Sequence, residues 1–426
     1  MNLLHANDRP GEHAPSWYAA TADAPGPYPE LRGTVRADVA VVGGGFTGLS
    51  AALALAERGV SVALIDAQRV GFGASGRNGG QVGMGQRVSQ PELERRHGAD
   101  AARALWELGA AAVDKVRALV REHAPDANWR DGVAEVVRKD GFDAVRREAE
   151  HMEQVYGHTL EVLDREALAA LIGSERYAAG ALDRVAGHVH PLRLAFGMAR
   201  SAEAAGARLF ERSEAHRVVE GLVQTGRGRI ECETVILACN GYLGGLDGAV
   251  AARVMPINNF VVATEPLGER MPLAEPIAVA DDDFVVNYWR PSEDGRLLFG
   301  GGESYGYRFP RDIAAVVRPK LEAVYPQLRG VHIDHAWGGT LAITRSRMPY
   351  FVRRGGVLSA SGYSGHGVAL ACLAGEILAE AARGETRRFD AFASLPAKAF
   401  PGGGAMRTPL LAMAMTWYAA RDRLGL

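Results

Sequence analysis

Short apolar runs alternate with amphipathic segments along much of the chain. Residues 38–66 read DVAVVGGGFTGLSAALALAERGVSVALID: an apolar run, a glycine turn, a small-residue helical segment and a second apolar run ending in Asp66. Uninterrupted apolar runs of this length are typical of strands that are buried on both faces of a parallel sheet. The order predicts a βαβ unit of the dinucleotide-binding kind.

Further along the chain the pattern changes from helical to β-rich and back. Helical periodicity covers 99–123 and 142–156, with the short strand GVAEVVRK between them, and HPLRLAFGMARSAEAAGARLF and ECETVILACNGY predict a helix followed by two strands. Residues 254–302 are β-rich, with NNFVVATEP, DFVVNYWRP and GRLLFGGG as predicted strands, and a helix is expected over 311–325. GGVLSASGYSGHGVALACLAGEILAEAARG then predicts a strand, a glycine loop and a helix.

The sequence also predicts structure for the segments near the two ends of the chain. Residues 9–36 are rich in Pro and Gly and are expected to lie as an arm on the surface. The final stretch, PLLAMAMTWYAARDRLGL, is an apolar helix candidate, for which packing against the body or a second subunit is favoured over contact with a membrane surface.

Size and charge narrow the class of protein. A chain of 426 residues exceeds the size of most single cores, so two domains are expected. With 48 basic and 50 acidic residues and a net charge of -2, nothing indicates a nucleic-acid surface, and a small-molecule partner is expected. The three cysteines are widely spaced, which fits a reducing cytoplasm and indicates neither a disulfide framework nor a zinc site. No apolar stretch long enough to span a membrane, and no leader sequence, is apparent.

The glycines of the first loop fit a bound dinucleotide. Gly43 permits a tight turn, Gly45 allows the backbone to approach a pyrophosphate, and Gly48 allows helix and strand to pack closely. Asp66 can accept hydrogen bonds from a ribose diol and would repel a phosphate there, which disfavours a phosphorylated nicotinamide. An ordinary solvated carboxylate is the alternative for Asp66.

Two further glycine loops extend this site. GFGASGRNGGQVG, residues 71–83, is expected to run along the cofactor, with Arg77, Asn78 and Gln81 able to bond to its ring or to a substrate; a flexible surface turn is the alternative. The loop over 362–367 precedes a helix, and the positive N-terminal end of this helix would face the ligand that the loop binds. Because a reduced flavin carries negative charge at its pyrimidine edge and a nicotinamide has no such need, this loop favours FAD.

These segments together resemble the FAD-dependent amine oxidases of the D-amino-acid oxidase superfamily, in particular the γ-glutamylputrescine oxidoreductase group. The resemblance rests on ADVAVVGGGFTGLSAALALAERG, GASGRNGGQ, WGGTLAITRSRMPYF, GYSGHGV and FPGGGAMRTPLL, and it covers essentially the whole chain. It implies an α/β fold: a Rossmann-like FAD-binding domain with a discontinuous second domain built on a mixed β-sheet. Residues 1–90, 184–250 and 331–426 are expected to bind FAD, and 91–183 and 251–330 to bind substrate.

The resemblance also implies the residues around FAD. Ala215 falls where family members contact adenine through the backbone. Some relatives attach flavin covalently to Cys or His, but Gly339 stands near the Cys position and the second loop has no His, so a non-covalent FAD is expected. The expected FAD-binding residues are Gly43, Gly45, Phe46, Thr47, Gly48, Asp66, Ala67, Gln68, Gly73, Ala74, Ser75, Arg77, Asn78, Gly79, Gly80, Gln81, Ala215, Asn240, Gly241, Gly362, Tyr363, Ser364, Gly365, His366 and Gly367.

The chemistry that the resemblance implies is hydride transfer from the carbon next to a neutral amine to the flavin, followed by imine hydrolysis and reoxidation by oxygen, which gives hydrogen peroxide. His366 could accept a proton or bond to the ring, or could matter only through its backbone. Tyr288 and Arg290 alternate along a strand and share a face. If that face looks at the flavin, Arg290 could bind a substrate carboxylate and Tyr288 could form a wall of the pocket; a surface ion pair is the alternative for Arg290. Trp337 could wall an aromatic slot or simply pack in the core.

Several alternatives stay open. The same fold could serve a dehydrogenase that passes electrons to a quinone or another carrier, a glycine- or sarcosine-type oxidase, or a flavin-binding protein without turnover. The two histidines before Pro191, His188 and His190, are not expected to bind a metal, because no carboxylate cluster accompanies them. A homo-oligomer is also possible.

Overall fold

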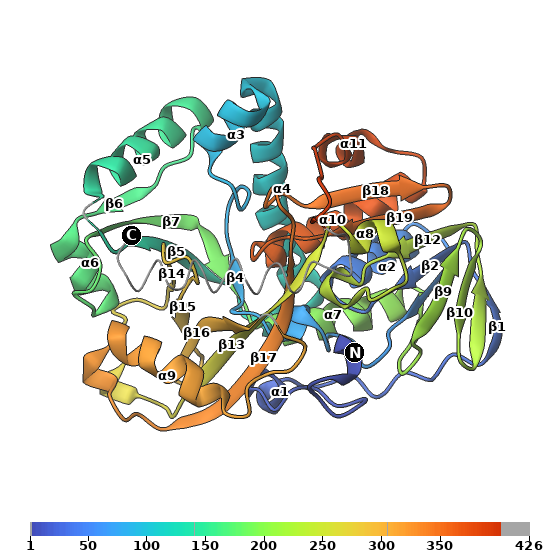
Figure 1. The fold of residues 1–426 in the computed structure, drawn as a ribbon, viewed down its shortest axis with the longest axis horizontal. Coiled ribbons are helices and arrows are strands. Elements are labelled where there is room, and N and C mark those ends of the chain that lie inside the picture. Colours follow the sequence, from blue (N-terminus) through green and yellow to red (C-terminus); the bar gives the residue numbers. More distant parts are fainter. Residues whose placement is uncertain (1, 140, 305, 402–426) are drawn as a thin grey trace.

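The computed structural model describes residues 2–139, 141–304 and 306–401, which form three sheets with helices between and around them (Figure 1). The predicted C-terminal helix over 409–426 lies outside the described residues. The predicted α/β class is confirmed, and the mixed sheet is the larger of the two principal sheets.

The central sheet is the one that the N-terminal βαβ pattern predicts. It has six strands in the order β18-β19-β12-β2-β3-β8, all parallel except β18. The bounds of its strands are β2 Val39–Val42, β3 Val62–Ile65, β8 Arg208–Phe210, β12 Thr234–Leu237, β18 Tyr350–Arg354 and β19 Val357–Ser361. Alternate side chains of each strand point to opposite faces, so Val39 and Val41 join a helix-covered core while Ala40 and Val42 join a second core.

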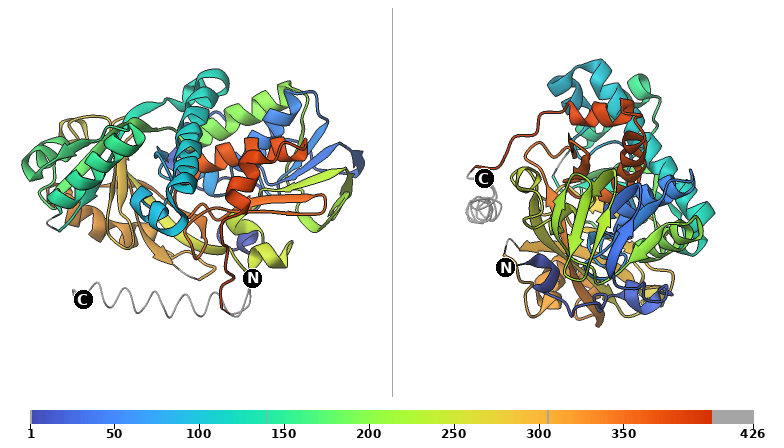
Figure 2. Two further views of the ribbon diagram at one scale, coloured as in Figure 1. Left: turned by 90° about the horizontal axis from the view of Figure 1, so that it is seen from above. Right: turned by 90° about the vertical axis from the view of Figure 1, so that its right-hand side faces the viewer.

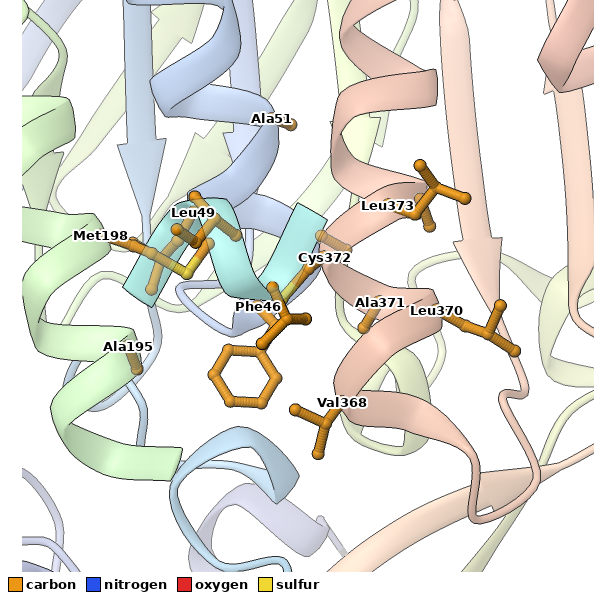
Figure 3. Close-up of a cluster of buried hydrophobic side chains, with 14 of the residues drawn as sticks. Phe46, Leu49, Ala51, Ala195, Met198, Val368, Leu370, Ala371, Cys372 and Leu373 are labelled. Carbon is orange, nitrogen blue, oxygen red and sulfur yellow. The ribbon is translucent and has the colours of Figure 1, made fainter. Parts of the chain in front are cut away.

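Three long helices cover one face of this sheet. They are α2 Phe46–Ala56, α7 Pro191–Ala204 and α10 Gly367–Ala382. Figure 3 shows Phe46 and Leu49 of α2 between side chains of α7 and α10, all of them buried. The helices α2 and α10 approach closely because Gly375 has no side chain: a Cβ there would lie 2.3 Å from the carbonyl oxygen of Thr47.

A small four-stranded sheet covers the other face, on the right of Figure 1. Its order is β1-β11-β10-β9, with β1 and β11 parallel and the other pairs antiparallel. Its strands are β1 Gly33–Arg36, β9 Ala215–Val219, β10 Leu222–Thr225 and β11 Gly228–Glu231.

The largest sheet has nine strands and mixed pairing. Its main path is β17-β13-β16-β15-β14-β5-β7-β4, and β6 pairs with β7. The bounds are β4 Gln81–Val82, β5 Arg130–Val137, β6 Glu161–Leu163, β7 Ala179–His188, β13 Met255–Thr264, β14 Ala278–Asp281, β15 Tyr288–Pro291, β16 Leu297–Ser304 and β17 Ile333–Ile343. On its outer side lie α6 Arg165–Ile172 and α9 Ile313–Val324, which share a buried apolar cluster with the sheet. Figure 2 shows this part of the molecule beside the central sheet rather than stacked on it.

The remaining helices are peripheral or short. They are α1 Trp17–Thr21, α3 Gln90–His97, α4 Ala99–His123, α5 Phe142–Tyr156, α8 Gly248–Ala251 and α11 Arg387–Ala393, with the 3-10 turns η1 Leu3–His5, η2 Ala74–Gly76, η3 Pro125–Ala127, η4 Asn240–Tyr242, η5 Gly268–Arg270 and η6 Pro326–Leu328. The helices predicted over 99–123 and 142–156 have the bounds that the periodicity indicated.

One predicted strand was too long. DFVVNYWRP forms a strand only from Tyr288, because the Asp281 carboxylate accepts hydrogen bonds from the backbone N–H and the side-chain amide of Asn287. These bonds close a loop between β14 and β15, and this loop turns the chain into an antiparallel hairpin.

The packing departs from the predicted domain limits in two places. Helix α4, expected with the substrate domain, packs on α10 and α7 and buries Leu105, Ala112 and Val116 in their apolar cluster. Strand β17, expected with the FAD domain, pairs with β13 along nearly its whole length in the nine-stranded sheet. The other limits stay a prediction.

Candidate active site

A cavity of about 830 Å³ is lined both by residues of the central sheet with its helices and by residues of the nine-stranded sheet. The three glycine loops line it together, although the first and the third are more than three hundred residues apart in the chain. Its volume is within the range of roughly 300–1,000 Å³ that is usual for cofactor and ligand pockets.

The first glycine loop has the geometry that a bound phosphate group requires. Gly43 has a φ of +113°, and a Cβ on Gly48 would lie 1.9 Å from the carbonyl oxygen of Gly43, so both positions need glycine. Gly45 caps the N-terminus of α2 and lines the cavity together with Phe46 and Thr47. The positive end of α2 therefore faces the cavity.

Asp66 stands beside this loop, at the end of β3. Its carboxylate accepts hydrogen bonds of 2.7 Å from the backbone N–H groups of Gly44 and Gln68. Burial raises the pKa of this carboxyl to about 6, with the two hydrogen bonds acting in the opposite direction. Asp66 and Ala67 line the cavity, as do Ala215 and Asn240.

Gln68 was predicted to bind FAD, but it is not among the residues that line the cavity. Its side chain accepts a hydrogen bond from Gly11 N–H and donates one to the carbonyl of Leu4, so it holds the N-terminal segment. Gly241 is not a lining residue either: it packs against β17, where a Cβ would lie 3.1 Å from the carbonyl oxygen of Leu341.

The second glycine loop runs along the cavity wall. The backbone or side chains of Gly73, Ala74, Ser75, Arg77, Asn78, Gly79 and Gln81 line it. Gly80 does not; it lies with a φ of +79° where a Cβ would be 2.2 Å from the carbonyl oxygen of Val189. Ser75 accepts a hydrogen bond from Phe46 N–H, and this bond ties the second loop to the first.

Three polar side chains of this loop, those of Arg77, Asn78 and Gln81, were predicted to bond to the cofactor ring or the substrate, and all three make hydrogen bonds to the protein. The amide of Gln81 donates to the carbonyl of Val279. The guanidinium of Arg77 donates to the carbonyls of Phe72 and Gly338 and pairs with Asp8. The amide of Asn78 donates to the carbonyls of Ala74 and Ser75, and its oxygen accepts from the N–H of Gly80. The side chains of Arg77 and Asn78 therefore shape the loop.

The third glycine loop closes the cavity at the N-terminus of α10. Tyr363, Ser364, Gly365, His366 and Gly367 line the cavity, whereas Gly362 lies behind them, with a φ of +78°, against Thr344. Together with Gly45 of α2, this loop places the N-termini of two neighbouring helices on one cavity.

His366 connects the third loop to the second. Its Nε2 lies 3.1 Å from the carbonyl oxygen of Gly83, which can only accept, so Nε2 carries the proton. Burial, with the charge of Arg87, lowers the pKa of the ring to about 4. His366 is thus neutral near pH 7 and acts as a hydrogen-bonded link at the cavity wall.

Tyr288 lines the cavity from β15. Its hydroxyl donates a 2.6 Å hydrogen bond to Oδ1 of Asn259, and a Cβ on either Gly79 or Gly300 would lie within 2.6 Å of its ring. The ring is therefore held between the second glycine loop and the sheet, as a wall of the cavity. Trp289, on the opposite face as expected, stacks on Phe299 in the outer core.

The other two predicted side chains, Arg290 and Trp337, are not lining residues of this cavity. Arg290 is 4% exposed and donates to the carbonyls of Gly79 and Val189 and to the hydroxyl of Tyr18. Trp337 is 1% exposed and donates to the carbonyl of Arg77. Arg290 shares the face of Tyr288, as the alternation predicted, but the second loop and Tyr18 of α1 cover it.

The sequence analysis missed the charged lining of the cavity. It includes Arg87, just after β4, and a group of acidic side chains from the nine-stranded sheet and its loops: Glu135, Asp281, Asp282, Asp283 and Glu303. One signal was present in the chain, because Glu135 is a charged residue in the middle of the otherwise apolar strand GVAEVV.

In the part of the chain that the structure describes, no group of three or more His, Cys, Asp or Glu side chains is arranged to hold a metal ion. Over the same residues, no helix has both the length and the apolar character needed to cross a membrane.

Comparison with known proteins gives concordant matches. The profile of the family described as "FAD dependent oxidoreductase" matches residues 38–381. A probable oxidoreductase, OrdL, of Rhizobium meliloti is 43% identical, over 96% of this chain and 97% of that protein. The γ-glutamylputrescine oxidoreductase of Escherichia coli is 40% identical, over 97% of this chain and 99% of its own length.

Solved structures share the fold. Glycine oxidase from Geobacillus kaustophilus superposes with a TM-score of 0.74 at 21% identity, covering 86% of this chain and all of that one. L-proline dehydrogenase from P. horikoshii gives a TM-score of 0.67 at 21% identity, over 84% of this chain and 95% of that one.

Proposed function

Because the chain belongs to the family of FAD-dependent oxidoreductases, we propose that it oxidises an amine, namely γ-glutamylputrescine or a related ω-amino or N-alkyl amino acid. The products would be an aldehyde or keto compound, an amine or ammonia, and hydrogen peroxide, with oxygen as the acceptor. The main support is the γ-glutamylputrescine oxidoreductase that is 40% identical over nearly the full length of both chains.

The residues of the cavity fit FAD. Gly43, Gly45 and the N-terminus of α2 would hold the pyrophosphate, and Asp66 would accept hydrogen bonds from the ribose. Residues 73–79 and Gln81 would lie along the flavin, and residues 363–367, at the N-terminus of α10, would hold its pyrimidine edge. The fit is supported by Gly43 and Gly48 of the first loop, where an added Cβ would collide with backbone, and by the two helix N-termini on one cavity.

Bound FAD would supply the oxidising power, as the acceptor of a hydride, two electrons and one proton, from the carbon next to the amine nitrogen. The protein's own groups bind and orient the amine and exclude water. Tyr288, held by Asn259, forms one wall, and His366 holds the second and third loops together. Neither needs to act as a base if the amine binds in its neutral form.

The charge of the cavity supports an amine in particular. Five acidic residues line the side formed by the nine-stranded sheet, whereas the lining arginines are Arg77, Arg87 and Arg347. Arg77 is neutralised by Asp8. An acidic lining raises the local concentration of a cationic substrate, and a buried carboxylate can accept hydrogen bonds from an ammonium group.

The test is a peroxide-coupled assay of the FAD-loaded protein in air, with γ-glutamylputrescine, putrescine, sarcosine, glycine and 4-methylaminobutyrate. Turnover that is fastest with γ-glutamylputrescine is the expected result. If only another amine gave peroxide, that amine would replace γ-glutamylputrescine as the proposed substrate. If an amine bleached the flavin in the absence of air and no peroxide formed on re-aeration, the electron acceptor would be a carrier and not oxygen.

A further inference from the structure

The cavity is lined by a cation, Arg87, and a carboxylate, Glu135, for which the described part of the chain offers no hydrogen-bond or ion-pair partner. Arg87 follows β4, and Glu135 lies in the middle of β5; both line the cavity and both side chains are exposed to it. Neither makes a hydrogen bond or an ion pair within 4.0 Å to any residue in the described ranges, although Arg87 is near enough for its charge to act on the carboxyl of Glu135 and the ring of His366.

The other charged lining residues are engaged with the protein. The Asp281 carboxylate accepts from Tyr177 and Asn287, that of Asp282 from Arg138 N–H, and that of Asp283 pairs with the guanidinium of Arg138. These contacts belong to the loop between β14 and β15 and have an evident structural role. Arg87 and Glu135 have none.

Strand register gives Glu135 room to receive a ligand. In β5 Glu135 alternates with Ala134 and Val136, whose side chains belong to the outer core, so the Glu135 side chain points to the opposite face, toward the cavity. Across the sheet, Glu135 is in register with Ala181 of β7 and Ala280 of β14. Two alanines beside a glutamate leave its carboxylate uncovered, and Tyr288 is the next residue in the same row.

Unpaired charges inside a protein are costly unless something binds to them. Arg87 and Glu135 carry opposite charges, share the cavity and do not pair with each other. A ligand with a carboxylate and an ammonium group on one carbon could bind both at once. These two groups are the α-carboxylate and α-ammonium of an amino acid.

We propose that Arg87 and Glu135 recognise the zwitterionic amino-acid end of the substrate, with Arg87 binding its carboxylate and Glu135 its ammonium. This inference rests on the proposed amine oxidation, because the reacting amine must then lie at the other end of the same molecule. The substrate class is an amino acid that carries a second amine at the end of its side chain or of a side-chain amide. Arg290, expected to bind the carboxylate, is replaced in this role by Arg87.

The test compares three amines with the same reacting end. γ-Glutamylputrescine carries both charges, glutarylputrescine lacks the α-ammonium, and N-acetylputrescine lacks both. Arg87→Gln is expected to lower the ratio of kcat/KM for γ-glutamylputrescine over N-acetylputrescine by about 100-fold, since the substrate carboxylate loses its charged hydrogen-bond donor. Glu135→Gln should lower the same ratio but leave the ratio of glutarylputrescine over N-acetylputrescine unchanged. Matched controls are Arg329→Gln and Glu153→Gln, at exposed positions outside the cavity lining.

A binding measurement separates this inference from the proposed function. γ-Glutamylbutylamide has the zwitterionic end but no reacting amine, and its affinity for the FAD-loaded protein is measured by calorimetry. If the wild type oxidises none of the amines but binds this compound, and both variants bind it about 100-fold more weakly, the proposed substrate is wrong and the recognition site holds. Unchanged ratios and affinities in the variants, or no binding by the wild type, would overturn the inference.

Discussion

The carboxylate of Asp8 lies 2.8 Å from Nη1 of Arg77, in an ion pair in which the arginine side chain is 2% exposed and the aspartate 13%. This pair joins the N-terminal segment to the second glycine loop. The guanidinium of Arg77 also lies over the ring of Phe72, and Leu4 of the same segment lines the cavity. The N-terminal segment therefore contributes Leu4 to the cavity wall and, through Asp8, holds the second loop that lines the cavity.

Loss of this pair should weaken both the fold and the retention of FAD. Asp8→Ala leaves a buried guanidinium without its counter-charge, which costs about 3 kcal/mol. We expect a lower melting temperature and faster release of FAD, followed by its fluorescence. Asp23→Ala, at an exposed aspartate, is the control. Equal FAD release from the two variants would mean that the N-terminal segment does not hold the cavity wall.

Gly48 tests the first glycine loop. In Gly48→Ala the new Cβ would lie 1.9 Å from the carbonyl oxygen of Gly43, so the turn or the helix must move. We expect purified protein with less than about half of the wild-type flavin absorbance per chain, because the turn would no longer fit a pyrophosphate. Gly245→Ala, where no atom lies within 4 Å of the added carbon, should keep full occupancy. A fully loaded Gly48→Ala protein would contradict this account.

Arg290 is expected to act on stability and not on substrate choice. Arg290→Ala removes the donor to the carbonyls of Gly79 and Val189, and two unsatisfied buried acceptors cost about 4 kcal/mol together. Denaturant unfolding measures the loss, with the exposed Arg329→Ala as control. The KM values for carboxylated and plain amines should change by the same factor. A rise in KM for the carboxylated amine alone would show that Arg290 binds the substrate.

Buried histidines should make stability depend on pH. Burial lowers the pKa of His190 to about 2, that of His188 to about 3 and that of His366 to about 4, from an ordinary value of 6.5. Between about pH 6.5 and 4 the unfolded chain therefore binds protons that the folded protein does not, so the free energy of unfolding falls as the pH is lowered.

His190→Asn isolates one of these contributions. Nδ1 of His190 accepts a hydrogen bond from Arg193 N–H at the N-terminus of α7, and Asn can replace it as a cap. The variant should lose less stability on acidification, by up to about 1.4 kcal/mol per pH unit below pH 6.5. Urea midpoints at pH 7, 6 and 5 measure this difference, with His216→Asn, at an exposed histidine, as control. Parallel curves for wild type and His190→Asn would contradict it.

The flavin should leave the protein on denaturation. Cys239 lines the cavity, but burial raises the pKa of its thiol to about 12, so it lacks the thiolate needed to attack a flavin. The ring of His366 is bonded to the carbonyl of Gly83, and Gly339 offers no side chain. Acid precipitation should leave a colourless pellet and free FAD in the supernatant. A yellow pellet would show a covalent bond.

Much of the fold followed from local pattern. The apolar runs of β2 and β3, the periodicity of α4 and the glycine loop before α10 each identify an element within a single stretch of chain, because strand and helix burial repeat with fixed periods. Pattern failed at residues 283–287, predicted as the first part of a strand, because hydrogen bonds from Asn287 to the Asp281 carboxylate hold them in a loop.

The roles of single side chains were harder to predict. Tyr288 and Arg290 share a strand face, as alternation requires, yet the hydroxyl of Tyr18 and the backbone of residues 79 and 189 cover Arg290 and leave Tyr288 on the cavity. The segments that cover Arg290 are distant in the chain, so the periodicity of the strand sequence cannot predict this burial.

The amino-acid order was thus sufficient for the class of fold, the dinucleotide-binding turn and the choice of FAD, because these depend on short stretches with strong steric demands, such as Gly43 and Gly48. The bonding of Arg77, the burial of Trp337 and the placement of Arg87 and Glu135 on one cavity depend on how the two large sheets pack. A side chain's partner is set by what lies within a few ångströms of it, and in a folded chain that neighbour is often more than a hundred residues away.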